Sequence, residues 1–376
     1  MEELKKSYLT EQIITYLGNK RTLLSHIKGV IDEIKPELNK EDKDIIAVDL
    51  FAGSGVVGRM LKECGFQVIS NDLEGYSHVI NSCYLSNKSE FNEIVYNGYY
   101  EKLKEILENK KYVNGIISEN YAPKNDDNIQ EGERAFYTSE NAKIIDTIRA
   151  FIDTVEEPYK KYFMAVLLYK ASVHTNTSGV FKGFYKSAKT GIGKFGGDGE
   201  NALSRIKGKI EIEKPILSDK ENKYTVYQKD ANVLVKELKD LDIVYMDPPY
   251  NQHPYASNYF MLNVILNNKI EGKMSKVSGI PDNWNRSAYN KRQEVKEAID
   301  NLVKDVDCKY LVVSYNSEGF VSLEDMKEIL GKYGEVTVKE IQYNAFRGSR
   351  NLKGRDIYVD EYLFILKKNK KDNGVS

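Results

Sequence analysis

The sequence predicts an α/β fold built on a mostly parallel sheet. Strand-like and helix-like patterns alternate at both ends of the 376-residue chain, and two further β-like runs follow one another near its end. Strands that alternate with helices favour a parallel sheet with a ligand at the carboxyl ends of its strands. At this length, we expect one large domain with an insertion, or two domains.

The first elements read as strand, tight turn and helix. Residues 45–50 form a β-rich run, residues 53–55 (Gly-Ser-Gly) close it, and apolar residues then recur at helical spacing up to Gly65. Residues 67–72 predict a second strand, and the pattern through residues 79–85 predicts a second helix. Two successive strands would therefore end at the same edge of the sheet.

The last third of the chain resumes this alternation. Residues 242–246 and 310–315 are apolar runs that predict buried strands, and residues 323–333 predict a helix. The runs 336–343 and 361–366 predict a terminal hairpin, which would supply antiparallel edge strands to the sheet.

In the middle of the chain, residues 99–229, the sequence pattern no longer alternates between strand and helix. Three helical segments are expected around residues 102–111, 142–151 and 159–172. Residues 176–195 are rich in glycine, in aromatic residues and in Lys182, Lys186, Lys189 and Lys194. That composition suits a mobile segment that touches a phosphate backbone, although composition alone fits a solvated flexible loop about as well.

Charge and cysteine content narrow the possible functions. The net charge of −1 provides no global positive field, so any contact with nucleic acid must use local patches of Lys and Arg. Cys64, Cys83 and Cys308 are unpaired by spacing, and the four histidines are scattered, so no zinc or iron site is readable and we expect no metal. The N-terminal residues have no signal-peptide pattern and no run is long enough to span a membrane, so we expect a cytoplasmic protein.

The tetrapeptide Asp247-Pro248-Pro249-Tyr250 directly follows one of the apolar runs. An exocyclic amino group on a base is a poor nucleophile, because its lone pair is delocalised into the ring. Asp247 offers a carboxylate acceptor for one N–H, and the Pro248 carbonyl, held between two prolines of fixed φ, can accept the other. Tyr250 would stack on the base. The motif therefore indicates methyl transfer to a base amino group, although a turn after a buried strand is an alternative reading.

The loop after the first strand suits a nucleoside-containing cofactor. Phe51, Gly53 and Gly55 combine an aromatic side chain with glycines that let the backbone approach a ligand. Asp72, about 20 residues further on, ends the second strand, where an acidic residue can bind both ribose hydroxyls. The third glycine of the dinucleotide fingerprint is missing, so S-adenosylmethionine fits better than NAD.

Five segments occur in the order seen in Dam-like, α-group adenine-N6 DNA methyltransferases, and the chain resembles that group over nearly its whole length. They are YLGNK at 16–20, DLFAGSG at 49–55, ND at 71–72, KDA at 229–231 and DPPY at 247–250. The resemblance implies a Rossmann-like S-adenosylmethionine-dependent methyltransferase sheet formed by residues 1–98 and 230–376. It also implies that residues 99–229 are an inserted, mainly helical target-recognition region.

The resemblance also assigns roles to individual residues. Residues implied to bind the cofactor are Tyr16, Gly18, Lys20, Asp49, Phe51, Gly53, Gly55, Asp72, Asp230 and Asp247. The first three form the N-terminal element that contacts the methionine end and shapes the target pocket. Asp72 binds ribose, Asp230 accepts from the adenine amino group, and Asp49 either contacts the cofactor or orients the loop.

The expected reaction begins when an adenine is extruded from duplex DNA, which costs a few kcal/mol. The base stacks on Tyr250, while Asp247 and Pro248 bind its N6, and the methyl group passes in one direct displacement. Besides the four lysines, we expect DNA contacts from His253, Tyr255, Arg347 and Arg350. Residues 251–259 would form a loop over the base or begin a helix against the sheet, and the late arginines would contact phosphate or lie on a solvated hairpin turn.

Two rival readings remain open. A cytosine-N4 methyltransferase uses the same amino-group chemistry, but such enzymes more often carry Ser in place of Asp247, so the sequence leans to adenine. The chain could instead be a non-catalytic DNA-binding protein with a methyltransferase fold, although every carboxylate and glycine that the chemistry needs is present.

As the modification enzyme of a restriction-modification system it would have a separate nuclease partner; a solitary role is the alternative.

Overall fold

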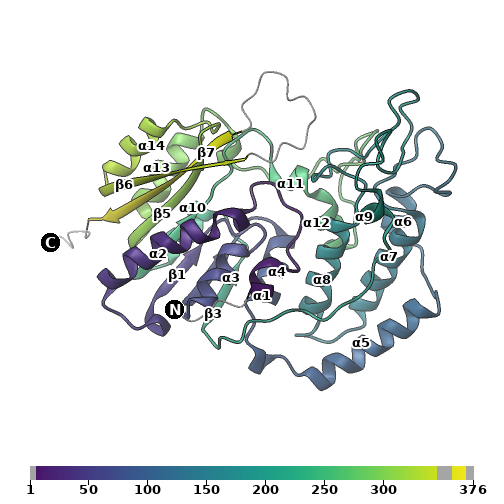
Figure 1. The fold of residues 1–376 in the computed structure, drawn as a ribbon, viewed down its shortest axis with the longest axis horizontal. Coiled ribbons are helices and arrows are strands. Elements are labelled where there is room, and N and C mark those ends of the chain that lie inside the picture. Colours follow the sequence, from purple (N-terminus) through teal and green to yellow (C-terminus); the bar gives the residue numbers. More distant parts are fainter. Residues whose placement is uncertain (1–5, 345–357, 370–376) are drawn as a thin grey trace.

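A computed structural model describes residues 6–344 and 358–369, so Arg347 and Arg350 lie outside the described residues. The sheet has seven strands in the order β3-β2-β1-β4-β5-β7-β6 (Figure 1). Their bounds are β1 (Ile46–Asp49), β2 (Gln67–Asn71), β3 (Tyr224–Tyr227), β4 (Leu241–Met246), β5 (Cys308–Asn316), β6 (Gly334–Asn344) and β7 (Tyr358–Lys368).

Strand direction agrees with the sequence-based prediction. The strands β3, β2, β1, β4 and β5 pair in parallel, and β7 is antiparallel to both β5 and β6. The chain leaves β1 toward β2 and β3, and later leaves β4 toward β5, so the strand order reverses between β1 and β4. Ligands of open α/β sheets bind at such a reversal, outside the carboxyl ends of the strands.

Helices cover both faces of the sheet and extend well beyond it. The α-helices are α1 (Lys6–Thr10), α2 (Leu24–Leu38), α3 (Val56–Glu63), α4 (Gly75–Tyr84), α5 (Glu93–Glu108), α6 (Ile116–Asn120), α7 (Ser139–Asp153), α8 (Lys160–Val173), α9 (Leu203–Lys207), α10 (Ala231–Glu237), α11 (Tyr255–Asn258), α12 (Phe260–Asn267), α13 (Val295–Asp305) and α14 (Leu323–Gly331). Short 3₁₀ helices are η1 (Lys20–Leu23), η2 (Asp42–Asp44), η3 (Lys88–Glu90) and η4 (Ala288–Asn290).

The sequence predicted six of the seven strands and the helices α3, α4, α5, α7, α8 and α14, but it did not predict the strand β3. The run Tyr224–Tyr227 is short and only half-buried, so its alternation is weak, yet it pairs with β2 in parallel. Although β3 lies within residues 99–229, which we expected to be inserted, it is part of the sheet. Helix α2 also went unpredicted, although its buried residues Ile27, Val30, Ile31 and Ile34 follow helical spacing.

Alternation along each strand divides the interior into two cores. On β4, Ile243 and Tyr245 face the core formed with α2, α3 and α4, whereas Val244 and Met246 face the core formed with α10, α13 and α14. Both faces are buried, which explains why the strand reads as a continuous apolar run. By the same alternation Asp247, two residues after Tyr245, lies on the first face.

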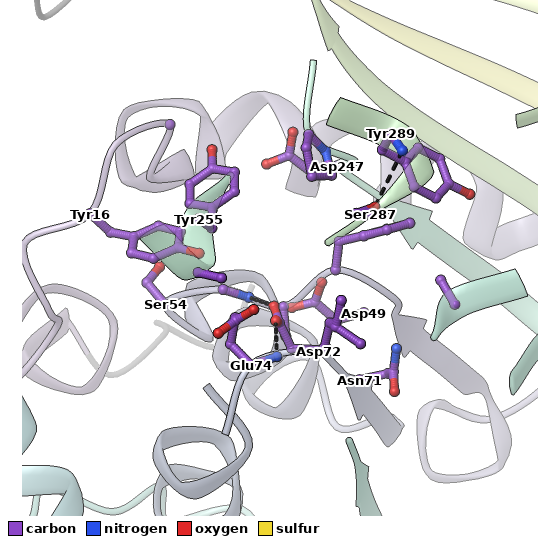
Figure 2. Close-up of a pocket in the computed structure, with 18 of the residues that line it drawn as sticks. Tyr16, Asp49, Ser54, Asn71, Asp72, Glu74, Asp247, Tyr255, Ser287 and Tyr289 are labelled. Atoms are coloured by element: carbon purple, nitrogen blue, oxygen red, sulfur yellow. Dashed lines mark hydrogen bonds between the residues drawn. The ribbon is translucent and has the colours of Figure 1, made fainter. Parts of the chain in front are cut away.

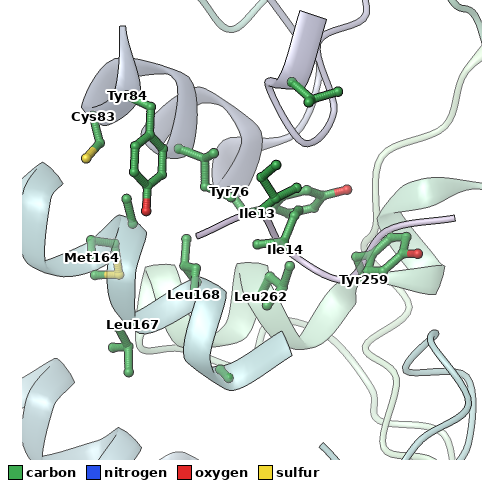
Figure 3. Packing of buried hydrophobic residues seen from close by; sticks show 14 of the residues in the cluster. Ile13, Ile14, Tyr76, Cys83, Tyr84, Met164, Leu167, Leu168, Tyr259 and Leu262 are labelled. Carbon is green, nitrogen blue, oxygen red and sulfur yellow. The ribbon is translucent and has the colours of Figure 1, made fainter. Parts of the chain in front are cut away.

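The helical part of the middle region shares the first core with the sheet. Tyr84 of α4, Leu168 of α8 and Leu262 of α12 meet with Ile13 and Ile14 of the N-terminal segment in one buried cluster (Figure 3). Because the inserted helices pack in the same core as Ile13 and Ile14, they are fixed relative to the residues that lead into the N-terminal motif.

The glycine-rich stretch of residues 176–195 is anchored, contrary to the expectation of a mobile segment. Phe181, Phe184 and Phe195 are at most 9% exposed and belong to the first core. The lysines between them are exposed. Aromatic side chains bury large apolar areas, so these rings hold the backbone while the cations face outward.

Arg59 of α3 attaches the N-terminal segment to the first core. Its guanidinium, 1% exposed, donates to the carbonyl oxygens of Tyr8, Glu11 and Gln12 at 3.0, 3.0 and 2.9 Å and lies 3.6 Å from the ring centroid of Tyr84. The chain continues from there to residues 16–20. The position of that motif therefore depends on this buried cation.

We expect Arg59→Ala to lower the free energy of unfolding by about 3 kcal/mol, because it leaves buried carbonyl oxygens without a donor. Urea denaturation would measure the change. Arg21→Ala, at an exposed position, is the control and should leave stability within about 0.5 kcal/mol of the parent. Equal stability of the two variants would contradict the anchoring role.

Candidate functional site

A pocket opens at the carboxyl edge of the sheet, where β1 and β4 lie side by side. The space between its walls, which is open to solvent, is about 910 Å³. Segments far apart in sequence contribute lining residues, which fall within 16–20, 49–57, 71–74, 229–231, 245–256 and 285–290. Figure 2 shows Tyr16, Asp72 and Asp247 around this pocket. The pocket therefore contains residues from all five sequence motifs.

The glycine loop between β1 and α3 has little space for side chains. Gly53 has φ +50°, and a Cβ there would lie 2.8 Å from Cε1 of Tyr16. Gly55 has φ +78°, and a Cβ there would lie 2.7 Å from Oδ1 of Asn81. Both conformations favour glycine, so the loop can approach a ligand only with these residues.

Asp72 is held by backbone donors at the end of β2. Its Oδ2 accepts from the Gly53 amide at 2.7 Å and its Oδ1 from the Glu74 amide at 2.9 Å (Figure 2). Burial raises its pKa, and these hydrogen bonds oppose the shift. Each oxygen keeps lone pairs toward the pocket, which suits the binding of hydroxyl groups.

Asp49 ends β1 and lies beneath the glycine loop. It is 1% exposed, its Oδ2 accepts from the Gly58 amide at 2.9 Å, and burial raises its pKa to about 8. Asp247 and Asp72 raise that pKa further, because their negative charges disfavour another one nearby. The floor of the pocket is thus an acidic cluster that would be stabilised by a positively charged ligand.

The charge of Lys20 is directed at two carboxylates. Its Nζ lies 3.0 Å from Oδ1 of Asp247 and 2.8 Å from Oε1 of Glu361, and the lysine side chain is only 6% exposed. Both carboxylates raise the pKa of Lys20, although burial opposes them. Lys20 also lines the pocket, but its ammonium group is already engaged by protein.

The tetrapeptide after β4 divides between the pocket and the interior. Asp247 and Pro249 line the pocket, while Pro248 is buried. Tyr250 is half-buried, and its carbonyl accepts from the Phe320 amide at 3.0 Å. Burial is the main cause that raises the pKa of Asp247, with Lys20 opposing and Glu361 adding to the shift.

Three tyrosines form a stack beside the tetrapeptide. The ring of Tyr16 lies against those of Tyr255 and Tyr259, at centroid distances of 4.9 and 4.5 Å, and the latter two are 6.1 Å apart. The Tyr255 hydroxyl donates to the Leu17 carbonyl at 3.3 Å. Residues 251–254 form an irregular loop and α11 begins at Tyr255, so the segment contains both a loop and the start of a helix. Tyr255 lines the pocket, since stacking places its ring against Tyr16.

The remaining wall of the pocket was missed by sequence reasoning. Tyr289 packs edge-on against Phe51 at 5.0 Å between centroids, and its hydroxyl donates to Asn232 at 2.7 Å. Ser287 and Asn290 line the same wall, and Asp230 caps α10 at its edge. No motif marks residues 285–290, because their place in the wall depends on the fold.

The basic residues of the anchored stretch lie in different surroundings. Lys182 contacts His253, with 3.3 Å between Nζ and Nδ1, beside the loop that follows the tetrapeptide. Lys194 pairs with Asp198 at 3.2 Å, and the Nζ of Lys186 lies 5.0 Å from the Phe184 ring centroid. Lys189 is exposed. Among these four lysines, Lys182 is thus the one that contacts the loop after the tetrapeptide.

Residues 16–329 match the family described as D12 class N6 adenine-specific DNA methyltransferase, and the chain belongs to that family. The type II methyltransferase M.NlaIII of Neisseria lactamica is 31% identical over 94% of this chain and 99% of its own. M.CviAII of Paramecium bursaria Chlorella virus 1 is 31% identical over 94% of this chain and 98% of its own. M.FokI of Planomicrobium okeanokoites is 27% identical over 94% of this chain and 52% of the relative.

The protein is therefore an S-adenosylmethionine-dependent enzyme that methylates N6 of adenine in DNA, on a Rossmann-like α/β sheet. The pocket fits this cofactor in charge and in donors. Its acidic floor complements the positive sulfonium and ammonium groups. Asn19 also lines the pocket, and its Nδ2 is buried without a hydrogen-bond partner among the described residues, which leaves a donor for a polar ligand atom.

Two observations concern residues 6–344 and 358–369 alone. No helix in these ranges has the length and apolar character that crossing a bilayer requires. The same ranges contain no grouping of three or more His, Cys, Asp or Glu side chains with the geometry of a metal site.

We expect Gly53→Ala to raise the dissociation constant for S-adenosylmethionine at least tenfold, because the added Cβ meets the Tyr16 ring at 2.8 Å on a strained backbone. Isothermal titration calorimetry would measure it. Gly29→Ala is the matched control, since nothing lies within 4 Å of a Cβ in that helix. Unchanged affinity in the first variant would contradict the close approach of the loop to the cofactor.

Proposed function

We propose that this enzyme belongs to the Dam-like subgroup and that Asp247-Pro248-Pro249-Tyr250 is its catalytic motif. One observation carries the proposal: the motif follows β4 at the strand-order reversal, and the Asp247 carboxylate faces the pocket with one oxygen bound to Lys20. Its second oxygen remains available to an amino group. The order of the five motifs in the chain supports the same subgroup.

The chemistry follows from the acceptors that this motif offers. The Asp247 carboxylate accepts one N–H of the target amino group and the Pro248 carbonyl accepts the other, so the nitrogen lone pair turns away from the ring. S-adenosylmethionine supplies the methyl group as an activated sulfonium. The nitrogen would gain that methyl as the methyl–sulfur bond breaks, the electron pair would stay on sulfur as a neutral thioether, and the Asp247 carboxylate would accept the proton that the nitrogen loses. Fixed positions of these acceptors lower the barrier, and no covalent enzyme intermediate is required.

We assign the cofactor to the side of the pocket that the glycine loop borders. Asp72 would bind the ribose hydroxyls, Phe51 and Tyr289 would border the adenine ring, and Asp230 would accept from the adenine amino group. Tyr16 and Gly18 would flank the methionine end. Gly53 and Gly55 allow the close approach, and Asp49 holds α3 beneath the loop through the Gly58 amide.

We assign the target adenine to the side of the pocket formed by the tetrapeptide. The base would leave the duplex, at a cost of a few kcal/mol, and stack on Tyr250. Tyr255 would border the base from the tyrosine stack, where its ring is held against Tyr16. Aromatic faces suit this role because every base has a π-face.

We propose that residues 99–229, apart from β3, form the target-recognition region and that residues 1–98 and 230–376 form the catalytic domain. Lys182 and His253 would contact the phosphate beside the extruded base, because they meet next to the catalytic loop. Lys186, Lys189 and Lys194 would contact the backbone further away. For Arg347 and Arg350, phosphate contact remains a sequence-based proposal.

The biological setting follows from the relatives. Because M.NlaIII and M.CviAII are named as type II methyltransferases, we propose that this enzyme is the modification enzyme of a restriction-modification system with a separate cognate endonuclease. We propose that it acts on double-stranded DNA in the cytoplasm. Cys64, Cys83 and Cys308 are not joined to one another by disulfides, which agrees with a reducing compartment.

We expect Asp247→Ala to abolish methylation while it leaves binding of S-adenosylmethionine partly intact, because the carboxylate acts on the target nitrogen. The measurement is single-molecule modified-base sequencing of plasmid DNA from a methylation-deficient host. Asp240→Ala, exposed just before β4, is the control and should keep the N6-methyladenine mark at one recurring sequence. A mark in the Asp247 variant, or N4-methylcytosine in the parent, would contradict the proposal.

The pH dependence follows from the raised pKa of Asp247. Only the ionised carboxylate accepts from the amino group, so the single-turnover rate should rise with pH and level off above that pKa. The acid limb should therefore lie well above pH ~4, where an exposed Asp titrates. Single-turnover rates measured from about pH 5 to about pH 9, at saturating DNA and cofactor, would give this pH profile. A rate that is flat down to pH ~5 would contradict the assignment.

A further inference from the structure

Glu361 is a fully buried carboxylate outside the pocket, and it lies next to the catalytic motif. It sits near the beginning of β7, opposite Asn316 in the antiparallel register with β5. Because β7 runs against the parallel strands, its beginning lies at the carboxyl edge of the sheet, beside the end of β5, which is the strand next to β4. None of the five sequence motifs includes this residue.

The two oxygens of Glu361 are held by three different groups. Oε1 accepts from Lys20 at 2.8 Å and from the Ser314 hydroxyl, and Oε2 accepts from Asn316 Nδ2 at 3.5 Å. Ser314 and Asn316 both belong to β5, a central strand of the sheet. A buried carboxylate costs free energy unless it is paired and hydrogen-bonded, and Glu361 meets both conditions.

We propose that Glu361 is a positioning residue for methyl transfer, which fixes the Lys20 ammonium on one oxygen of Asp247 and leaves the other oxygen to the target amino group. This inference rests on the proposed catalytic role of Asp247. A lysine has a flexible four-carbon stem and three rotatable donors. Because the Glu361 carboxylate also holds the Lys20 ammonium, at 2.8 Å, the ammonium stays on one oxygen of Asp247 and does not bridge both.

The charge balance gives Glu361 a second effect. One ammonium between two carboxylates leaves one net negative charge, so Asp247 remains a strong acceptor instead of being neutralised by its own salt bridge. Asp247 also faces the carboxylate of Asp49 from β1 and the phenols of Tyr245, Tyr250 and Tyr255. In this surrounding, Glu361 raises and Lys20 lowers the pKa of Asp247.

The test is Glu361→Gln, which keeps the size of the side chain and an acceptor for Lys20 but removes the charge. Lys20 then pairs with Asp247 alone, so the carboxylate becomes a weaker acceptor and a stronger acid. We expect the plateau of the single-turnover rate to fall about tenfold and affinity for S-adenosylmethionine to change less than about threefold. The acid limb of the rate should move to lower pH.

A purely structural role would not move the pH profile, and a matched control measures that role directly. Asp242 is an equally buried carboxylate on β4, paired with Lys40 at 2.7 Å and Lys309 at 3.0 Å. It lies at the other end of the strand, about 16 Å from Asp247. Asp242→Asn should lower thermal stability and leave both the plateau and the acid limb unchanged.

Two further variants keep the test decisive if Glu361→Gln folds poorly. Ser314→Ala removes only the hydroxyl that fixes Glu361 and should lower the plateau in the same direction, by a smaller factor. In a Lys20→Gln background, Glu361→Gln should cause no further loss, because its effect passes through Lys20. An additive loss there, or a parent-like plateau and acid limb in Glu361→Gln, would overturn the inference.

The failure of this inference can be told apart from failure of the proposed function. If Asp247→Ala still methylates DNA, the catalytic assignment is wrong and Glu361 has no role through it. If Asp247→Ala is inactive while Glu361→Gln retains the parent rate and pH profile, only the inference about Glu361 is wrong.

Discussion

The buried ion cluster of Lys20, Asp247 and Glu361 is the interaction on which the active site depends. It joins the N-terminal segment, the end of β4 and the beginning of β7, which lie far apart in the chain. Each of the three charges would be costly in this position without the others. The cluster therefore brings the catalytic carboxylate and the N-terminal motif into one fixed arrangement, and the hydrogen bonds of Glu361 to β5 tie that arrangement to the central sheet.

The sheet topology explains why cofactor and substrate residues meet. The strand order reverses between β1 and β4, so the glycine loop after β1 and the tetrapeptide after β4 leave the sheet side by side. The N-terminal segment also lines the pocket, held by Arg59 and by the contacts of the Tyr16 ring with Tyr255 and Tyr259. The inserted helices share the same core, so the surface that carries Lys182 is also fixed relative to the pocket.

Local patterns predicted those parts of the site whose chemistry and backbone are set by neighbours in sequence. Asp247 follows a strand that reads as a buried apolar run, and Gly53 needs its identity for a turn with positive φ. Glu361 was predicted only as part of a β-like run, because its contact with Lys20 spans 341 positions. The wall at residues 285–290 has no motif for the same reason, and Tyr289 acquires its place only through Phe51 and Asn232. The composition of residues 176–195 suggested a mobile segment, yet its phenylalanines anchor it, since composition does not tell which side chains are buried.

The most direct test of the account is a crystal structure of the enzyme with a non-reactive cofactor analogue and a duplex that contains its methylation sequence. The account predicts that N6 of an extruded adenine donates to the Asp247 oxygen that Lys20 does not hold, while Lys20 stays between Asp247 and Glu361. An adenine amino group bound elsewhere, or a Lys20 ammonium that has left both carboxylates for the cofactor or a phosphate, would contradict it.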